Sequence, residues 1–163
     1  ACIMDSYRAL NSSFKIGPIP LWMLHHPPMN DKNGKRLMAA MITARKMVKR
    51  GLVREIGICN ATVAQIEMVD EVAGPLACVQ SSFSLWDKAA ALPLRAKEGS
   101  TSRRGLIDWC RQHGVVFVPH GVFGGLKARD GRRDLASDFP RIAALAKKLN
   151  TSPHALTLAW MRR

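Results

Sequence analysis

The sequence predicts an α/β fold with parallel strands. Short apolar runs alternate with longer amphipathic segments along the 163 residues, and strands joined by crossover helices form parallel sheets with right-handed connections. The composition is 47% hydrophobic and 23% charged, which is enough to build a core and excludes wholesale disorder. The length suits a single domain, so we expect one domain over residues 1–163.

Four short segments are predicted to be strands because they are apolar or β-branched and are bounded by turn residues. They are Leu21–Leu24, Val53–Cys59, Leu76–Gln80 and Val115–Val118. The first strand is expected to end at His25, because Pro27 and Pro28 can continue neither a sheet ladder nor a helix.

Six segments are predicted to be helices. Thr62 with Gln65 forms a capping-box pattern, and Ser152 followed by Pro153 is a typical helix start, while Gly51 is placed to end a helix. The predicted helices are the stretch up to Ile16, Asn33–Arg50, Thr62–Ala73, Ser102–Gln112, Phe139–Leu149 and Ser152–Arg163. Between them, Asp87–Thr101 and the glycine-rich, basic segment Gly121–Asp138 are predicted to be loops.

Charge and cysteine content narrow the class of protein. The chain carries 25 Lys and Arg against 12 Asp and Glu, a net charge of +13, which would suit an acidic partner such as RNA, an anionic membrane or a phosphate-bearing cofactor; a basic organellar protein is the alternative. The 4 cysteines form no C-x-x-C pair and no metal-ligand spacing, so we expect no metal site and reduced thiols typical of an intracellular protein, cytoplasmic or organellar. No apolar run approaches the roughly 18 residues of a membrane span.

Polar residues follow the predicted strands at their carboxyl ends, where parallel α/β folds carry their chemistry. In chain order these residues are His25, Cys59 with Asn60, Gln80, and His120 with Gly121.

This series, in this order, resembles the aldo-keto reductase family. The segment from Leu21 to Pro27 is similar to the family's fourth strand, which ends in a histidine. The segment Gly51–Asn60 is similar to the Gly-x-Val-Arg-x-Ile-Gly-x-Ser-Asn pattern of the family's fifth strand. Gln80 matches a glutamine of the family's sixth strand. The segment His120–Gly125 matches the Tyr-Ser-Pro-Leu-Gly segment that follows the family's seventh strand. The segment Ser152–Met161 matches the family's Thr-Pro-x-x-x-Ala-Leu-x-Trp helix.

The resemblance implies a (β/α)₈ TIM-barrel type of fold of which this chain is only about half. A complete barrel needs about 250 residues, and the matched motifs run from the fourth strand to the helices after the seventh. We therefore expect a fragment or a truncated member, starting at Ala1 rather than Met.

The resemblance also implies a reaction, the transfer of a hydride from NAD(P)H to the carbonyl carbon of an aldehyde or ketone. It gives His25 a catalytic role in orienting and polarising the carbonyl. It makes Cys59, Asn60, Gln80, His120 and Gly121 cofactor-binding, with NADP the expected cofactor. Side-chain amides at Asn60 and Gln80 can both donate to and accept from a carboxamide, and His120 takes the place of a tyrosine that stacks on the nicotinamide. Cys59 and Gly121 each replace a serine.

The family's catalytic aspartate, tyrosine and lysine have no counterpart in this sequence. The one tyrosine, Tyr7, precedes the strand of His25 and is not placed to be the proton donor. We therefore expect no carbonyl reduction by this chain alone.

Other interpretations stay open. The chain could be a non-catalytic, degenerate reductase-like subunit of a larger, organellar or RNA-containing assembly, because a half barrel leaves open strand edges that invite a protein partner. The basic helix Lys35–Arg50 could bind RNA through phosphates, although a solvated helix face is the simpler reading. His25 could be a loop histidine, Asn60 a turn residue and Gln80 a buried, satisfied amide.

Overall fold

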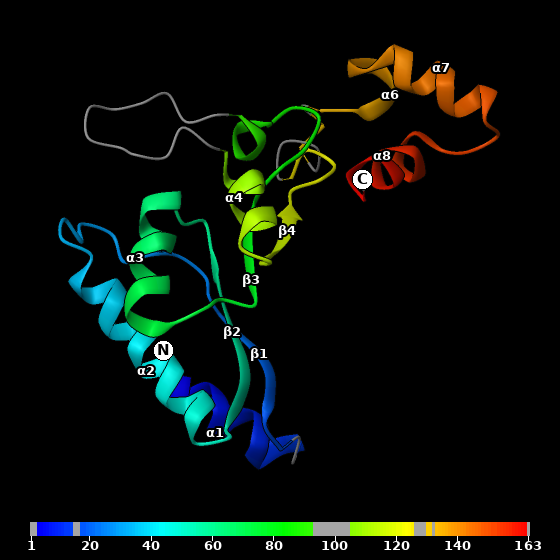
Figure 1. Cartoon of the computed structure of the whole chain (residues 1–163). Coiled ribbons are helices and arrows are strands. Elements are labelled where there is room, and N and C mark those ends of the chain that lie inside the picture. The colour runs from blue at the N-terminus through cyan, green and yellow to red at the C-terminus, as the bar shows by residue number, and fades with distance from the viewer. Residues whose placement is uncertain (1–2, 15–16, 93–104, 126–129, 132, 163) are drawn as a thin grey trace. The chain divides into compact units, whose positions relative to one another are not determined.

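The computed structural model describes residues 3–14, 17–92, 105–125, 130–131 and 133–162 of the chain. Four parallel strands form one sheet in the order β1-β2-β3-β4, which is their order along the chain (Figure 1). The strands are β1 (Ile19–Leu24), β2 (Val53–Cys59), β3 (Cys78–Ser82) and β4 (Val116–His120). The predicted α/β class with a parallel sheet is therefore confirmed.

The helices follow the predicted segments closely, and a short 3₁₀ turn, η1 (Ala89–Ala91), lies between β3 and α4. The helices are α1 (Ile3–Phe14), α2 (Lys35–Lys49), α3 (Val63–Ala73), α4 (Leu106–Gln112), α6 (Leu135–Asp138), α7 (Pro140–Lys148) and α8 (Pro153–Met161). The capping box at Thr62 is present in both directions, and Ser152 accepts a hydrogen bond from the backbone N–H of Ala155. These caps form because a side-chain oxygen satisfies an N–H that the first helical turn leaves without a partner.

Several predicted element bounds differ from the structure. Strand β1 starts two residues earlier than predicted, at Ile19, and β4 runs from Val116 to His120, two residues beyond its predicted end. Strand β3 starts two residues later than predicted, at Cys78, which pairs with Gly57, and continues to Ser82, two residues beyond its last pair with β2 at Gln80. Helix α6 lies within the predicted loop Gly121–Asp138, where Asp134 caps it by accepting from the N–H of Ser137. Helix α4 has Gly105 as its N-cap; the predicted cap, Ser102, lies outside the described residues.

The described chain divides into two compact units. Unit 1 comprises residues 1–81 and 89–118, and unit 2 comprises residues 82–88 and 119–163. Each unit is described by itself below.

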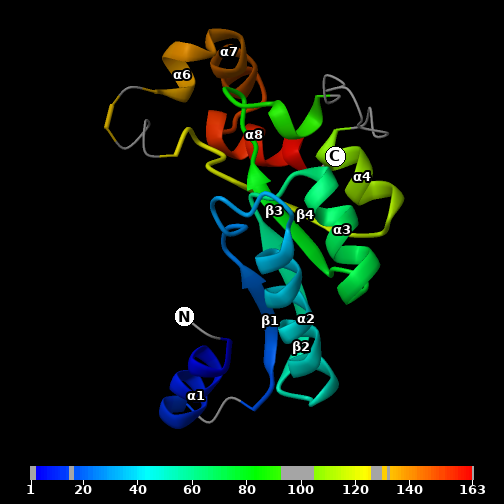
Figure 2. The same cartoon turned by 90° about the vertical axis from the view of Figure 1, so that its left-hand side faces the viewer.

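The core of unit 1 lies between one face of the sheet and two helices, α2 and α3. Both helices cover the same face in the two views of the chain (Figures 1 and 2). Ile56, Ile58 and Val79, which that face presents, have no exposed surface. Burying such a side chain stabilises the fold by roughly 1.5–3 kcal/mol. The helices contribute the buried residues Leu37, Met41, Ala44, Met47, Val63, Ile66, Val69 and Ala73.

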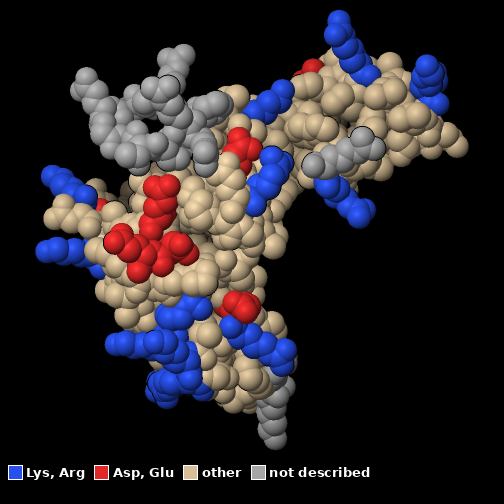
Figure 3. Space-filling view, viewed as in Figure 1, with Lys and Arg blue, Asp and Glu red and all other residues tan. Residues whose placement is uncertain are grey.

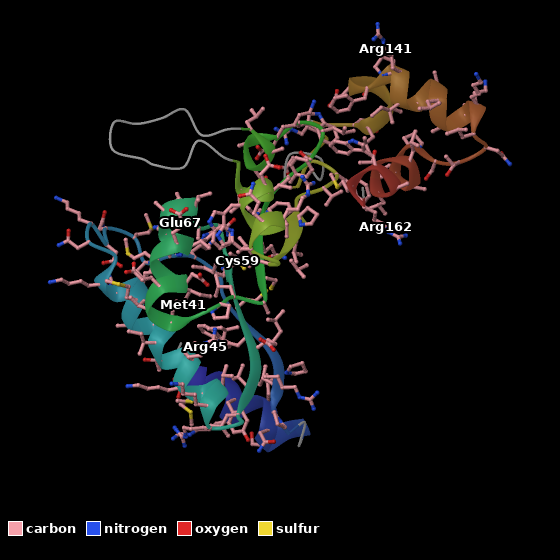
Figure 4. The ribbon with its side chains drawn as sticks, viewed as in Figure 1. Met41, Arg45, Cys59, Glu67, Arg141 and Arg162 are labelled. Carbon is pink, nitrogen blue, oxygen red and sulfur yellow. The ribbon has the colours of Figure 1, made fainter. Side chains whose placement is uncertain are left out.

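Arg45 joins the two helices of unit 1. Its Nε donates to the carbonyl of Ala73 at 2.6 Å, and its Nη2 donates to the carbonyl of Pro75; Figure 4 shows the side chain on α2. These carbonyls lie at the end of α3, where the helix itself supplies no donor. Arg45 is thus committed to holding the two helices together.

Among the described residues, no helix is both long enough and apolar enough to cross a membrane.

Cys110 on α4 is fully buried in unit 1, and burial raises the pKa of its thiol to about 11. The neutral thiol is favoured in the folded chain, so stability from this group is complete below its ordinary pKa of 9.0 and is lost as the pH rises toward about 11.

We expect the free energy of unfolding to fall as the pH rises from about 9 to about 11. The contribution of Cys110 to this fall is up to about 2.7 kcal/mol, because each pKa unit corresponds to about 1.36 kcal/mol. Urea denaturation across this range measures the slope. The variant Cys110→Ala should show a flatter slope even though its stability at pH 7 is lower. Equal slopes in the two proteins would contradict the assignment.

Candidate functional site

Four of the six predicted site residues lie together at the carboxyl ends of the first three strands of unit 1. His25 follows β1, Cys59 ends β2, Asn60 follows it, and Gln80 lies within β3. In the register of the parallel ladder, Cys59 pairs with Gln80, and Leu24 pairs with Ile58 one position before. Parallel pairing therefore places these residues level at one edge of the sheet.

Asn60 connects the three strand ends. Its backbone N–H donates to the carbonyl of Gln80 at 2.8 Å, and its side-chain Nδ2 donates to the carbonyl of His25 at 3.1 Å. The residue has a φ of 56°, a left-handed conformation that asparagine tolerates better than other residues with a Cβ. This turn carries the chain off β2 while the side chain reaches back to β1.

Cys59 and Gln80 form a second link across the sheet. The Cys59 Sγ lies 3.5 Å from the Gln80 Oε1 in a thiol–carbonyl hydrogen bond. Burial raises the pKa of the Cys59 thiol, which keeps it protonated and able to donate at neutral pH. This contact fixes which end of the Gln80 amide faces Cys59.

Gly57 has no side chain, and the space this leaves on β2 is filled by residues of the two neighbouring strands. Met23, Gly57 and Cys78 form one row of the ladder, and the Cys78 Sγ lies 3.8 Å from the Met23 Sδ. A Cβ on Gly57 would stand 2.7 Å from the Cys78 Sγ and 2.8 Å from the Cys78 carbonyl oxygen, closer than real Cβ atoms approach. This row lies two positions before Cys59 and Gln80 in the ladder, and it requires glycine at position 57. Burial also raises the pKa of the Cys78 thiol, and a nearby charge on Cys59 would raise it further.

The His25 side chain is exposed at the strand-end edge. Its ring contacts the ring of His26, with centroids 4.2 Å apart and an angle of 55° between the planes. Within the described residues, no three His, Cys, Asp or Glu side chains come together in a set that could hold a metal ion.

The other two predicted site residues, His120 and Gly121, form a second group in unit 2. They line an open cavity of about 510 Å³ together with Ser82, Ser84, Gly124, Gly125 and Arg133. Gly121, Gly124 and Gly125 have φ values of 66°, 94° and 59°, which side chains with a Cβ rarely adopt. This backbone explains why the chain has glycine, not serine, at position 121.

Arg133, like Ser82 and Ser84, lines the cavity but was not predicted as a site residue from the sequence. Its Nη1 donates to the carbonyl of Gly124 at 3.5 Å, and its guanidinium carbon lies 5.5 Å from the centre of the Trp86 ring. Trp86 is itself held by Asp138, which accepts from its Nε1 at 2.8 Å, and by an edge-on contact with Phe139. In the sequence Arg133 was one of several dispersed arginine pairs, and no spacing connected it with His120.

The Asn60 turn gives a stability prediction. Asn60→Gly keeps the left-handed backbone and loses the bond to His25, which is worth about 0.5–1.5 kcal/mol. Asn60→Ala loses the bond and also places an ordinary Cβ at positive φ, which costs about 1 kcal/mol more. Urea denaturation of both variants should therefore rank them wild type, Asn60→Gly, Asn60→Ala.

Asn150 is a matched control, because it is exposed and has a φ of 50°. Its glycine variant should cost less than Asn60→Gly, while the difference between its glycine and alanine variants should be similar. If Asn60→Gly is as stable as the wild type, the bond to His25 contributes nothing.

Comparison with known proteins places the chain in a family. The sequence profile of the Aldo/keto reductase family matches residues 1–163. The chain is 27% identical over 159 residues to a methylglyoxal reductase of Escherichia coli O157:H7, covering 97% of this chain and 49% of that protein. It is 25% identical over 144 residues to an uncharacterised oxidoreductase of Schizosaccharomyces pombe, covering 88% of this chain and 39% of that protein.

Solved structures show the same fold. An aldo/keto reductase from Klebsiella pneumoniae in complex with NADP and acetate matches with a TM-score of 0.67 at 17% identity, over 97% of this chain and 50% of that chain. A glycerol dehydrogenase from Gluconobacter oxydans matches with a TM-score of 0.70 at 18% identity, over 98% of this chain and 50% of that chain. The chain thus spans about half the length of the proteins it matches, and its four parallel strands align to half of their barrel. Because the family profile matches the whole sequence, the chain belongs to the aldo/keto reductase family.

Proposed function

We propose that this chain is the part of an NAD(P)H-dependent carbonyl reductase that carries one catalytic histidine and the nicotinamide side of the cofactor site. The observation that carries the proposal is the hydrogen-bonded cluster of His25, Cys59, Asn60 and Gln80 at the strand ends. The substrate class is an aldehyde or ketone. Because the chain matches half of its relatives' length, the remaining catalytic groups would come from polypeptide outside this sequence.

The amide of Gln80 suits a nicotinamide carboxamide. Its Oε1 accepts from the Cys59 thiol, so its Nε2 is left to donate to the carboxamide oxygen of a bound cofactor. Asn60 lies beside it and takes the second carboxamide contact that the family resemblance implies. NADPH, when bound, supplies the hydride.

His25 would act on the substrate carbonyl. Its exposed ring can donate a hydrogen bond to the carbonyl oxygen, where negative charge grows as the hydride arrives. The bond from the Asn60 Nδ2 to the His25 carbonyl holds the backbone that presents this ring. In this proposal Asn60 therefore positions the catalytic residue as well as the cofactor.

The cavity of unit 2, taken by itself, suits an anionic ligand such as a phosphate group. Arg133 supplies a cation, and the glycines let a phosphate approach the backbone without side chains in the way. His120 offers a ring that can stack on an aromatic ligand. The donors of this cavity fit a dinucleotide better than a neutral small molecule.

A non-catalytic role in a larger assembly is the alternative, and the net charge of +13 favours it. The experiments below separate the two functions, because an assembly subunit does not need Gln80 or His25 for nucleotide binding or turnover.

Cofactor binding is the first test. The 163-residue chain should bind NADPH, measured by the enhancement of NADPH fluorescence, and Gln80→Ala should raise the Kd about fivefold, since one neutral hydrogen bond is worth about 1 kcal/mol. Gln112→Ala, at the exposed end of α4, is the matched control and should leave the Kd unchanged. Equal Kd values for the wild type and Gln80→Ala would contradict the role of Gln80.

Activity is the second test, made on the native protein that contains this sequence. Its NADPH oxidation with methylglyoxal should lose at least about 10²-fold in kcat in the variant His25→Ala, the scale of one positioned acid–base or oxyanion group. The neighbouring exposed residue gives the control His26→Ala, which should retain most of the activity. Turnover that His25→Ala leaves unchanged would overturn the catalytic assignment.

A further inference from the structure

The outward face of α2 is strongly basic. The helix contains no acidic residue, and its apolar side is buried through Leu37, Met41 and Met47. At 100° per residue, all of its exposed basic side chains fall within one arc of the surface. They are Lys35, Arg36, Lys46 and Lys49, with Arg50 directly after the helix.

The charge is densest where α2 ends and β2 begins. Lys46, Lys49, Arg50 and Arg54, here called the basic turn, are all exposed. Every second side chain of a strand points to the same face of the sheet. Arg54 therefore shares a face with Ile56 and Ile58, the face that α2 covers. Figure 3 shows Lys and Arg gathered over this end of unit 1, at the lower left.

Positive charge is in excess at the basic turn: its four cations face one neighbouring acidic residue of β2, the exposed Glu55. The ion pair between Arg111 and Asp108 lies elsewhere, on α4. Figure 4 labels Glu67 on α3, higher in the same view than Arg45. Arg45 is not part of the basic turn, because its guanidinium holds the carbonyls of Ala73 and Pro75.

The composition of this surface decides between two kinds of anionic partner. A helix that binds a lipid surface inserts its apolar face, but the apolar face of α2 is buried against the sheet. Residues 35–54 contain no Phe, Trp or Tyr, so the surface offers no platform on which unpaired bases could stack. A rigid row of cations without aromatic residues suits the phosphates of a duplex, which are contacted without reading the bases.

We propose that the basic turn of α2 binds double-stranded nucleic acid through its phosphates. The basic turn lies at the start of β2, whereas Cys59 and the strand-end cluster lie at its other end. A bound duplex would therefore leave the strand-end cluster of unit 1 accessible. This binding is independent of the proposed reductase function.

The test measures how affinity depends on salt. The 163-residue chain is titrated into a labelled 20-base-pair DNA duplex, and into an RNA duplex of the same sequence, at several salt concentrations. We expect a Kd of about 10⁻⁴–10⁻⁶ M at physiological salt, without sequence preference, and a log–log slope of about −0.9 per phosphate contacted on the DNA.

The variant Lys46→Gln/Lys49→Gln/Arg50→Gln removes three of these contacts. It should weaken binding at least tenfold at low salt and make the DNA slope shallower by about 2.7. The matched control is Arg141→Gln/Lys147→Gln/Lys148→Gln, which removes the same residue types from the exposed surface of α7; Figure 4 labels Arg141. The control should retain the wild-type affinity and slope. Circular dichroism of both variants checks that they are folded.

Three outcomes would overturn the proposal. The first is no duplex binding at low salt. The second is equal weakening by the two variants, which would show that net charge alone drives the binding. The third is binding to phosphatidylserine vesicles, lost in the α2 variant, without binding to either duplex.

Discussion

The hydrogen bonds of Asn60 hold the ends of three parallel strands in one arrangement, and the strand-end cluster depends on them. The Asn60 backbone N–H donates to the Gln80 carbonyl and so extends the ladder between β2 and β3 by one hydrogen bond. The Asn60 side chain donates to the His25 carbonyl, just after the end of β1. Without these bonds the chain after β2 would be free to leave the sheet in another direction. The sheet face covered by α2 and α3 buries Ile56, Ile58 and Val79 completely. This packing also fixes the register of the strands. Packing and hydrogen bonding thus agree on the same alignment.

Much of this arrangement could be predicted from the sequence, because the relevant signals are local. The capping box at Thr62 and the strand Val53–Cys59 follow from neighbouring residues, and both are confirmed. Parallel pairing then predicts that residues after successive strands meet at one edge, and the bonds among His25, Cys59, Asn60 and Gln80 bear this out. Their roles toward a cofactor remain a prediction.

The parts that could not be predicted depend on contacts between distant segments. Arg133 takes its place through the ring of Trp86 and the carbonyl of Gly124, and neither partner is visible from the residues around it. Arg45 resembled the other basic residues of its helix, yet it donates to the carbonyl of the last residue of α3, Ala73, and to that of Pro75 just after the helix. Helix α6 is too short for a periodic pattern and exists because Asp134 caps it.

The left-handed backbone at Gly121, Gly124 and Gly125 has a consequence for recognition. The turn already has an unusual conformation that glycine adopts at little steric cost, and the hydrogen bond from the Gly124 N–H to the Gly121 carbonyl, 2.8 Å long, fixes it. The conformational entropy of ordering this loop is therefore lost when the chain folds, not when a ligand arrives. An anion entering beside Arg133 would keep more of its interaction energy as affinity, and replacing these glycines by alanine would move that entropic and steric cost back to the moment of binding.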